Sequence, residues 1–154
     1  MSAEYRLVEL GLLLPALEPV KHSYVRARQS GLLVFLAGQT PKRDGGYPFK
    51  GKLGAEVSVE QGQECARICA LNLLAAAREH LGSLDQIAQI IQVTGYVASA
   101  PSFTQQPLVI NAASDLLVAL LGEAGRHART AIGVAALPSD APVEIDLVLE
   151  ARSG

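Results

Sequence analysis

The segment from Ser58 to Gly82 constrains the fold of this chain more than any other stretch. The Ser58 hydroxyl can accept a hydrogen bond from the backbone amide of Gln61, and the Gln61 side chain can reach back, which is the capping box that begins a helix. Gly82 is typical of a helix end. Apolar residues recur at helical spacing at positions 65, 68, 69, 73 and 76. Because this Ala-rich helix is apolar around much of its circumference, we expect it to be well buried.

Strand-like segments flank this helix on both sides. The first two strands would be joined as a hairpin by residues 29–31, and the last two would form a final hairpin. A second helix is expected over 107–122, and residues 5–14 would form a strand or a short helix. The resulting order, β-β-α-β-α-β-β, is an α+β fold with two helices on one face of a mixed sheet. The expected strands are residues 24–28, 32–37, 87–97, 129–136 and 143–151.

The number of helices is too small to cover both faces of this sheet. Several strands, including 87–97, carry apolar residues on both faces. Helices on one face would leave the other exposed, and a large exposed apolar patch usually marks an interface. We therefore expect a homo-oligomer that buries the second face of the sheet.

Length and composition favour one soluble domain over residues 1–154. Apolar residues make up 49% of the 154 residues and charged residues 18%, which excludes intrinsic disorder. The net charge of −2 argues against a dedicated nucleic-acid binder. No apolar run approaches a membrane span and no signal-peptide pattern is present, so a cytoplasmic protein is expected. Cys65 and Cys69 are interpreted as core thiols rather than metal ligands, since no histidine or further cysteine accompanies them.

Arg129 is the one charged residue in a strand-like run that otherwise suits a core. A buried guanidinium is costly unless an anionic group meets it. Side chains alternate along a strand, so the face that carries Arg129 is otherwise lined by small residues. That arrangement leaves space beside a fixed cation for a small anionic ligand. The small residues are Ala131, Gly133 and Ala135.

The partner of Arg129 is not decided by this pattern. If 129–136 and 143–151 pair as a hairpin, Glu144 lies on the same side of the sheet as Arg129, at about 13 Å. The alternative is a strand-end arginine near solvent that pairs with Glu123 or Glu150. His127 could act as a base, although a lone histidine in a loop more often does not.

The stretch HARTAIGVAALPSDAPVEIDLVLEA at 127–151 resembles the C-terminal signature of the RidA/YjgF family. SYVRARQSGLLVFLAGQTP at 23–41 and VINAASDLL at 109–117 agree with that family in order and spacing. The resemblance implies a chorismate-mutase-like subunit and a homotrimer with clefts between subunits. It also implies hydrolysis of reactive 2-enamine/2-imino acids, such as 2-iminobutanoate and 2-iminopropanoate, to 2-oxo acids and ammonia. No metal or organic cofactor is implied, because an imine is already electrophilic.

The resemblance also assigns site residues. Arg129 would hold the substrate carboxylate through two parallel hydrogen bonds, and Glu144 would hold water or move protons. The same resemblance makes Tyr24, Gly38 and Asn111 substrate-binding residues, so Tyr24 and Asn111 should lie near Arg129. The sequence departs from well-studied members at two positions, where Ala37 replaces a serine and Ala131 replaces a cysteine. These departures affect substrate preference more than the carboxylate anchor.

Two other functions compete with imine hydrolysis. The family's older label is an endoribonuclease that inhibits translation, which the acidic pI of 5.9 and the lack of a basic stripe disfavour. Its only support is the loop over 38–54, whose charges solvation explains equally well. A non-catalytic module that binds a small carboxylate would need Arg129 but not Glu144. The basic residues of the loop are Lys42, Arg43, Lys50 and Lys52.

Overall fold

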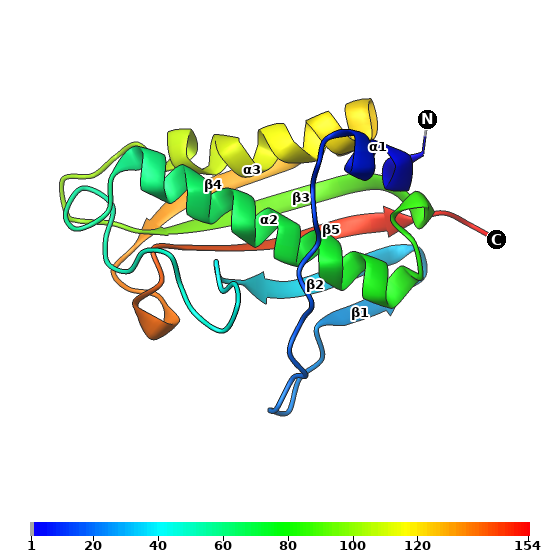
Figure 1. Ribbon diagram of the computed structural model, residues 1–154, viewed down its shortest axis with the longest axis horizontal. Helices are drawn as coiled ribbons and strands as arrows, with labels where there is room; N and C mark the ends of the chain where they lie inside the picture. Colours follow the sequence, from blue (N-terminus) through cyan, green and yellow to red (C-terminus); the bar gives the residue numbers. More distant parts are fainter. Residues whose placement is uncertain (1) are drawn as a thin grey trace.

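The computed structural model describes residues 2–154 and contains a five-stranded mixed sheet with helices on one face (Figure 1). The spatial order of the strands is β1-β2-β5-β3-β4, in which β3 and β4 run parallel and the other neighbours antiparallel. The predicted α+β class, the two covering helices and the element order are confirmed. The bounds are β1 (Ala27–Ser30), β2 (Leu33–Gln39), α2 (Val59–Leu81), β3 (Ile87–Ala98), α3 (Gln106–Leu121), β4 (Ala128–Val134) and β5 (Val143–Ala151).

Helix α2 begins and ends where its sequence predicts. The Ser58 hydroxyl accepts from the Gln61 amide (3.2 Å), and the Gln61 side chain accepts from the Ser58 amide (3.0 Å). Gly82 ends the helix in the left-handed region (φ 86°). Cys65 and Cys69 are fully buried, which confirms that they are core residues, and burial raises the pKa of Cys65 to about 12. A thiol held this firmly protonated is a poor nucleophile.

Four short helices complete the structure, of which α1 (Ala3–Glu9) resolves the predicted strand or short helix over 5–14 as a helix. The Glu4 carboxylate binds α1 to its surroundings by accepting from Arg78 of α2 (2.7 Å) and from the Leu84 amide (2.9 Å). The hydrogen bond from Arg78 lowers the pKa of Glu4. The others are 3₁₀ helices: η1 (Leu84–Gln86), η2 (Gly122–Gly125) and η3 (Pro138–Asp140).

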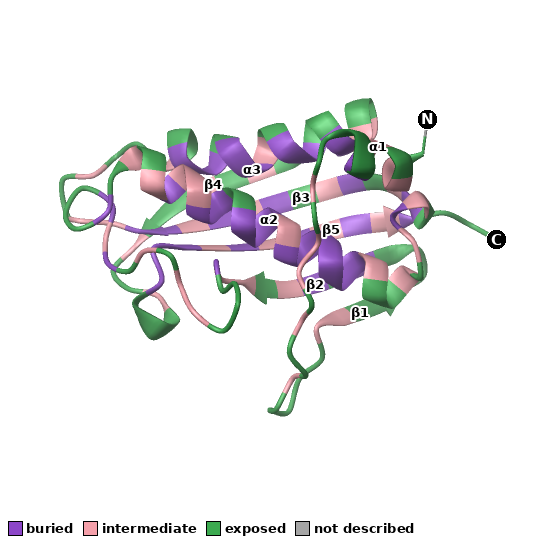
Figure 2. Ribbon diagram, in the orientation of Figure 1, coloured by how far each residue is buried: buried purple, intermediate pink, exposed green. Residues whose placement is uncertain are grey.

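The two faces of the sheet differ in burial, and buried and more exposed residues alternate along β5 in Figure 2. The face under α2 and α3 forms the core, and β5 illustrates the alternation: Val143, Ile145, Leu147 and Leu149 are buried there. The other face, called the open face below, exposes Phe35 by 48% and Ile132 by 44%. The expectation of apolar residues on an uncovered face is met at these positions. The homo-oligomer inferred from them stays a prediction.

The predicted final hairpin is wrong. β4 and β5 do not pair; β3 lies between them, parallel to β4 and antiparallel to β5. The chain between β4 and β5 is long enough to pass the end of β3, and it turns through η3, where Ser139 and Asp140 adopt positive φ. β3 is the longest strand and its Val93 and Val97 are fully buried, so a central position buries more apolar surface than an edge position would.

The segment Gln106–Gly125 is long and apolar enough, by length and a mean hydropathy of 1.5, to cross a membrane. The sequence analysis did not anticipate this. The segment contains α3, which buries Val109, Ile110 and Leu117 against α2 and the sheet (Figure 2). It is a core helix.

Candidate functional site

Arg129 lies on β4 at one edge of the sheet, on the face that α3 covers. Its Nη1 donates to Asn111 Oδ1 (2.8 Å) and to Ser114 Oγ (3.2 Å), both on α3. Asn111 and Ser114 are three residues apart and therefore share one face of the helix. Within residues 2–154 Arg129 makes no ion pair, so the predicted alternatives with Glu123 or Glu150 are wrong. Half-buried Arg129 is thus fixed by neutral acceptors.

His127 extends this network. Its Nε2 lies 2.9 Å from Ser114 Oγ and its Nδ1 lies 2.7 Å from the Gly125 carbonyl oxygen. Burial lowers the pKa of His127, and the neighbouring charge of Arg129 lowers it further. The set Arg129, Asn111, Ser114 and His127 is called the arginine group below. Ser114 was not predicted as a site residue; its spacing of three residues from Asn111 was the available signal.

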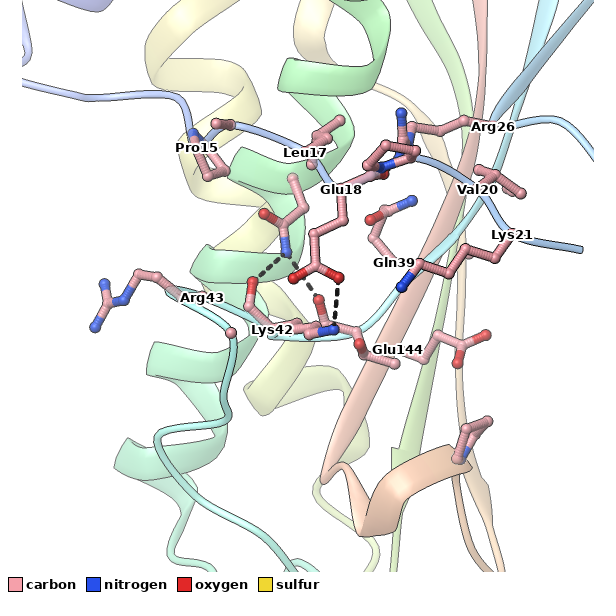
Figure 3. A pocket seen from close by; sticks show the side chains of 18 of the residues that line it. Pro15, Leu17, Glu18, Val20, Lys21, Arg26, Gln39, Lys42, Arg43 and Glu144 are labelled. Carbon is pink, nitrogen blue, oxygen red and sulfur yellow. Dashed lines mark hydrogen bonds and ion pairs between the residues drawn. The ribbon is translucent and has the colours of Figure 1, made fainter.

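A second cluster, the glutamate group, consists of Tyr24, Gly38 and Glu144. All three line a cavity of about 900 Å³ near the ends of β2 and β5 (Figure 3). The other walls are residues 15–22, which cross over α2, and the loop that follows β2. Buried Asn72 of α2 holds that loop by donating to the carbonyl oxygens of Thr40 (2.9 Å) and Lys42 (3.0 Å).

Gly38 and Glu144 are in close contact. A bulge between Leu36 and Gln39 interrupts the β2–β5 pairing and brings Gly38 against the carboxylate. A Cβ at position 38 would lie 2.5 Å from Glu144 Oε2, so only glycine fits without moving that side chain. Family membership alone made Gly38 a candidate; the structure supplies the steric reason for glycine.

Burial raises the pKa of half-buried Glu144, and the nearby charge of Asp146 raises it further. Asp146 lies two residues along the same face of β5 and accepts a hydrogen bond from the Tyr96 hydroxyl (3.0 Å). Glu144 therefore holds its proton more strongly than an ordinary glutamate. That property suits a group that both gives and takes a proton.

Charged side chains also line the cavity. Lys42 pairs with Glu18 (2.9 Å), and Figure 3 shows Glu18 reaching from the segment that crosses α2 to Lys42 of the loop, with Arg43 pointing away from the pair. Lys21, on the segment that crosses α2, also lines the cavity. Both partners of the ion pair are largely exposed, so it contributes little to stability.

The arginine and glutamate groups lie apart in one chain. Glu144 is opposite Tyr96, whose partner on β4 is exposed Ile132, so Glu144 lies on the open face. Arg129 is opposite buried Val93 and lies on the helix-covered face. The prediction that Glu144 shares the side of Arg129 is therefore wrong, because both strands pair with β3 in a register that aligns Glu144 with Ile132 rather than with Gly133. Strand rise and spacing put the two Cα atoms about 14 Å apart.

Tyr24 is also far from Arg129 within the chain. It precedes β1, and β1 and β4 are the opposite edges of the sheet. Of the two residues predicted to lie near Arg129, the structure brings Asn111 into contact and leaves Tyr24 with Glu144. The two positions that depart from the family lie one in each group. Ala37 lines the cavity of the glutamate group, and Ala131 shares the face of Arg129 on β4.

Residues 4–150 match the family described as "YjgF/chorismate_mutase-like, putative endoribonuclease". The chain belongs to the YjgF/RidA family. It is 43% identical to Protein TCP17 of Trypanosoma cruzi over 94% of this chain and 91% of TCP17. It is 44% identical to Atu1372 of Agrobacterium tumefaciens, a protein described as of unknown function, with a TM-score of 0.88 over 97% of this chain and 91% of that one.

A more distant YjgF/RidA relative shows a ligand. The structure of E. coli TdcF with bound serine is 25% identical to this chain, with a TM-score of 0.59 over 91% of this chain and 93% of TdcF. The resemblance stated from the C-terminal stretch is thus confirmed at the level of family and fold. Among residues 2–154, no cluster of three or more His, Cys, Asp and Glu side chains could hold a metal ion.

Proposed function

We propose that this YjgF/RidA protein hydrolyses reactive 2-imino acids, such as 2-iminobutanoate, to 2-oxo acids and ammonia. The observation that carries the proposal is the state of Arg129. Its guanidinium is oriented by two neutral oxygens, has no carboxylate partner among the described residues, and shares its face with small Ala131. A planar guanidinium with free N–H groups binds a carboxylate in two parallel hydrogen bonds.

The chemistry needs one further group that moves protons. Water attacks the imine carbon, and the nitrogen takes a proton as the carbon–oxygen bond forms. The tetrahedral intermediate then loses ammonia as its hydroxyl proton leaves and the carbonyl forms. Half-buried Glu144, with its raised pKa, suits both transfers. Gly38 would keep the carboxylate of Glu144 in place, and Tyr24 would line the same pocket.

The two groups can act on one small substrate only if they come from different chains. Arg129 and Glu144 lie on opposite faces of the sheet, at a separation longer than 2-iminobutanoate. The open face, with exposed Phe35 and Ile132, offers the apolar surface for assembly. We therefore include a homotrimer in the proposal, in which Arg129 of one subunit meets Glu144 of the next.

Arg129 provides the test of the activity. The assay couples a threonine dehydratase to the protein and follows the release of 2-oxobutanoate. Arg129→Ala should reduce kcat/KM roughly ten- to hundred-fold, because a charge-assisted contact contributes about 1.5–3 kcal/mol. Arg129→Lys should recover only part, since a point charge does not orient a planar carboxylate. Equal rates for Arg129→Ala and the parent protein would end the proposal.

Subunit mixing tests the shared site. Arg129→Ala and Glu144→Gln proteins should each be nearly inactive alone. After unfolding and refolding together, random assembly would give about a quarter of the interfaces one intact arginine group and one intact glutamate group, and about that share of the parent activity. Mixtures no more active than either variant would contradict a site between subunits.

A carboxylate-binding module without catalysis is the second candidate, because TdcF has been solved with bound serine. The parent protein would then bind 2-oxobutanoate through Arg129 yet leave the dehydratase reaction unaccelerated. Isothermal titration beside the coupled assay separates these outcomes.

A further inference from the structure

The two partners of His127 fix the tautomer of its neutral ring. The Gly125 carbonyl oxygen, 2.7 Å from Nδ1, can only accept a hydrogen bond. Nδ1 therefore carries a proton, and Nε2 of the neutral ring is left as an acceptor. At 2.9 Å from Nε2, the Ser114 hydroxyl must be the donor.

This fixes the Ser114 hydroxyl in one orientation. With its only proton directed at His127, its lone pairs are left to accept from Arg129 Nη1 at 3.2 Å. The Asn111 side-chain oxygen accepts from the same Nη1. One nitrogen of the guanidinium is thus held by two acceptors, while Nε and Nη2 take no part in this network.

We propose that His127 and Ser114 are positioning residues that hold the Arg129 guanidinium for carboxylate binding, through the chain Gly125 carbonyl, neutral His127, Ser114 hydroxyl and Arg129. The proposal rests on the function proposed above for Arg129. Protonated His127 would have to donate from Nε2 to Ser114 Oγ, which also accepts from Arg129. Two cations would then share one hydroxyl oxygen, and their repulsion would weaken the hold on the arginine.

On balance the surroundings favour the neutral ring. Arg129 on β4 is the charged group in this network, and α3 contributes neutral Asn111 and Ser114. Burial lowers the pKa of His127 below its ordinary value of 6.5, the Gly125 carbonyl oxygen opposes this by accepting from Nδ1, and the charge of Arg129 lowers the pKa further. The network should therefore stay intact at neutral pH and fail only under more acidic conditions.

The chain can be tested by carboxylate affinity, with 2-oxobutanoate as the probe in isothermal titration. Ser114→Ala and His127→Ala should each weaken binding about five-fold, the value of one hydrogen bond. Because both residues act in one series of hydrogen bonds, the double variant should bind 2-oxobutanoate no more weakly than Ser114→Ala alone. His127→Gln, whose amide oxygen can accept from Ser114, should restore affinity for 2-oxobutanoate. It should also remove the loss of affinity that the parent protein shows under more acidic conditions. Exposed Ser102→Ala is the control.

A second measurement does not depend on the proposed function. Nitrogen NMR of the full chain should show neutral His127 protonated at Nδ1, with a pKa that rises in Arg129→Gln. The opposite tautomer, or additive losses in the double variant, would overturn the inference. If the parent protein fails to bind 2-oxobutanoate, the proposed function fails. The NMR result still decides whether the hydrogen bonds from Gly125 through His127 and Ser114 to Arg129 exist.

Discussion

The arginine group and the glutamate group differ in how completely one chain builds them. Every polar side chain of the arginine group has a partner within the group, so its geometry is set before any ligand arrives. The Glu144 carboxylate, by contrast, accepts no hydrogen bond from the described residues and borders an open cavity. The difference teaches that the proposed carboxylate anchor is preorganised within one chain, whereas the carboxylate proposed to transfer protons remains accessible to water or to another subunit.

The largest effect is expected from Glu144→Gln, which distinguishes the role of the glutamate group from that of the arginine group. Glu144→Gln keeps the shape of the side chain and removes its proton transfer, which typically contributes a factor of about a hundred or more. We expect kcat in the coupled assay to fall by about that factor while affinity for 2-oxobutanoate changes little. Arg129→Ala should do the opposite and weaken affinity. If Glu144→Gln chiefly weakened binding, the division into anchor and proton-transfer group would be wrong.

Gly38→Ala sharpens the description of the glutamate group. The new Cβ would lie 2.5 Å from Glu144 Oε2, so the carboxylate must move. Displacement of a catalytic group by about an ångström can cost up to a hundred-fold, and we expect about a ten-fold loss in kcat. Gly46→Ala is the matched control, since a Cβ there meets no atom within 4 Å. Equal losses for both variants would show that the Gly38–Glu144 contact is irrelevant to turnover.

Asn111→Ala tests how much of the arginine group can be lost. Arg129 would keep Ser114 as its acceptor, and the loss of one hydrogen bond predicts about a five-fold rise in Kd for 2-oxobutanoate. The thermal midpoint should hardly change, because Asn111 is exposed. Asp115→Ala, an exposed neighbour on α3, serves as control. A loss as large as that of Arg129→Ala would mean that the two acceptors are not independent supports.

The smallest effect concerns stability. Since burial raises the pKa of Glu144, the folded state binds its proton more tightly than the unfolded chain does. Stability from this group is complete below its ordinary pKa of 4.5 and is lost as pH rises through the raised value. Glu144→Gln should therefore raise the thermal midpoint slightly at neutral pH, with no gain in acid. A lower midpoint at neutral pH would show that the ionised carboxylate is stabilised by partners in the assembly.

The position of β3 explains which site predictions held. Arg129 and Asn111 meet because α3 packs along β4, and their contact was anticipated from the family resemblance. The prediction that Arg129 and Glu144 lie on one side of the sheet assumed that their consecutive strands pair as a hairpin. β3 lies between them, which adds the width of a strand, and the register on β3 aligns Glu144 with Ile132 instead of Gly133, which puts Glu144 on the other face. The partners of a strand depend on burial summed over the whole sheet, and no local pattern contains that sum.

The sequence by itself determined the local structure. The capping box at Ser58, the stop at Gly82 and the strand over 143–151 each depend on neighbours a few residues away, and each appears in the structure as predicted. Only the tertiary structure decided that His127 and Ser114 support Arg129 and that Gly38 contacts Glu144. Those contacts join α3 to β4 and β2 to β5, and they exist because the core fixes these elements side by side.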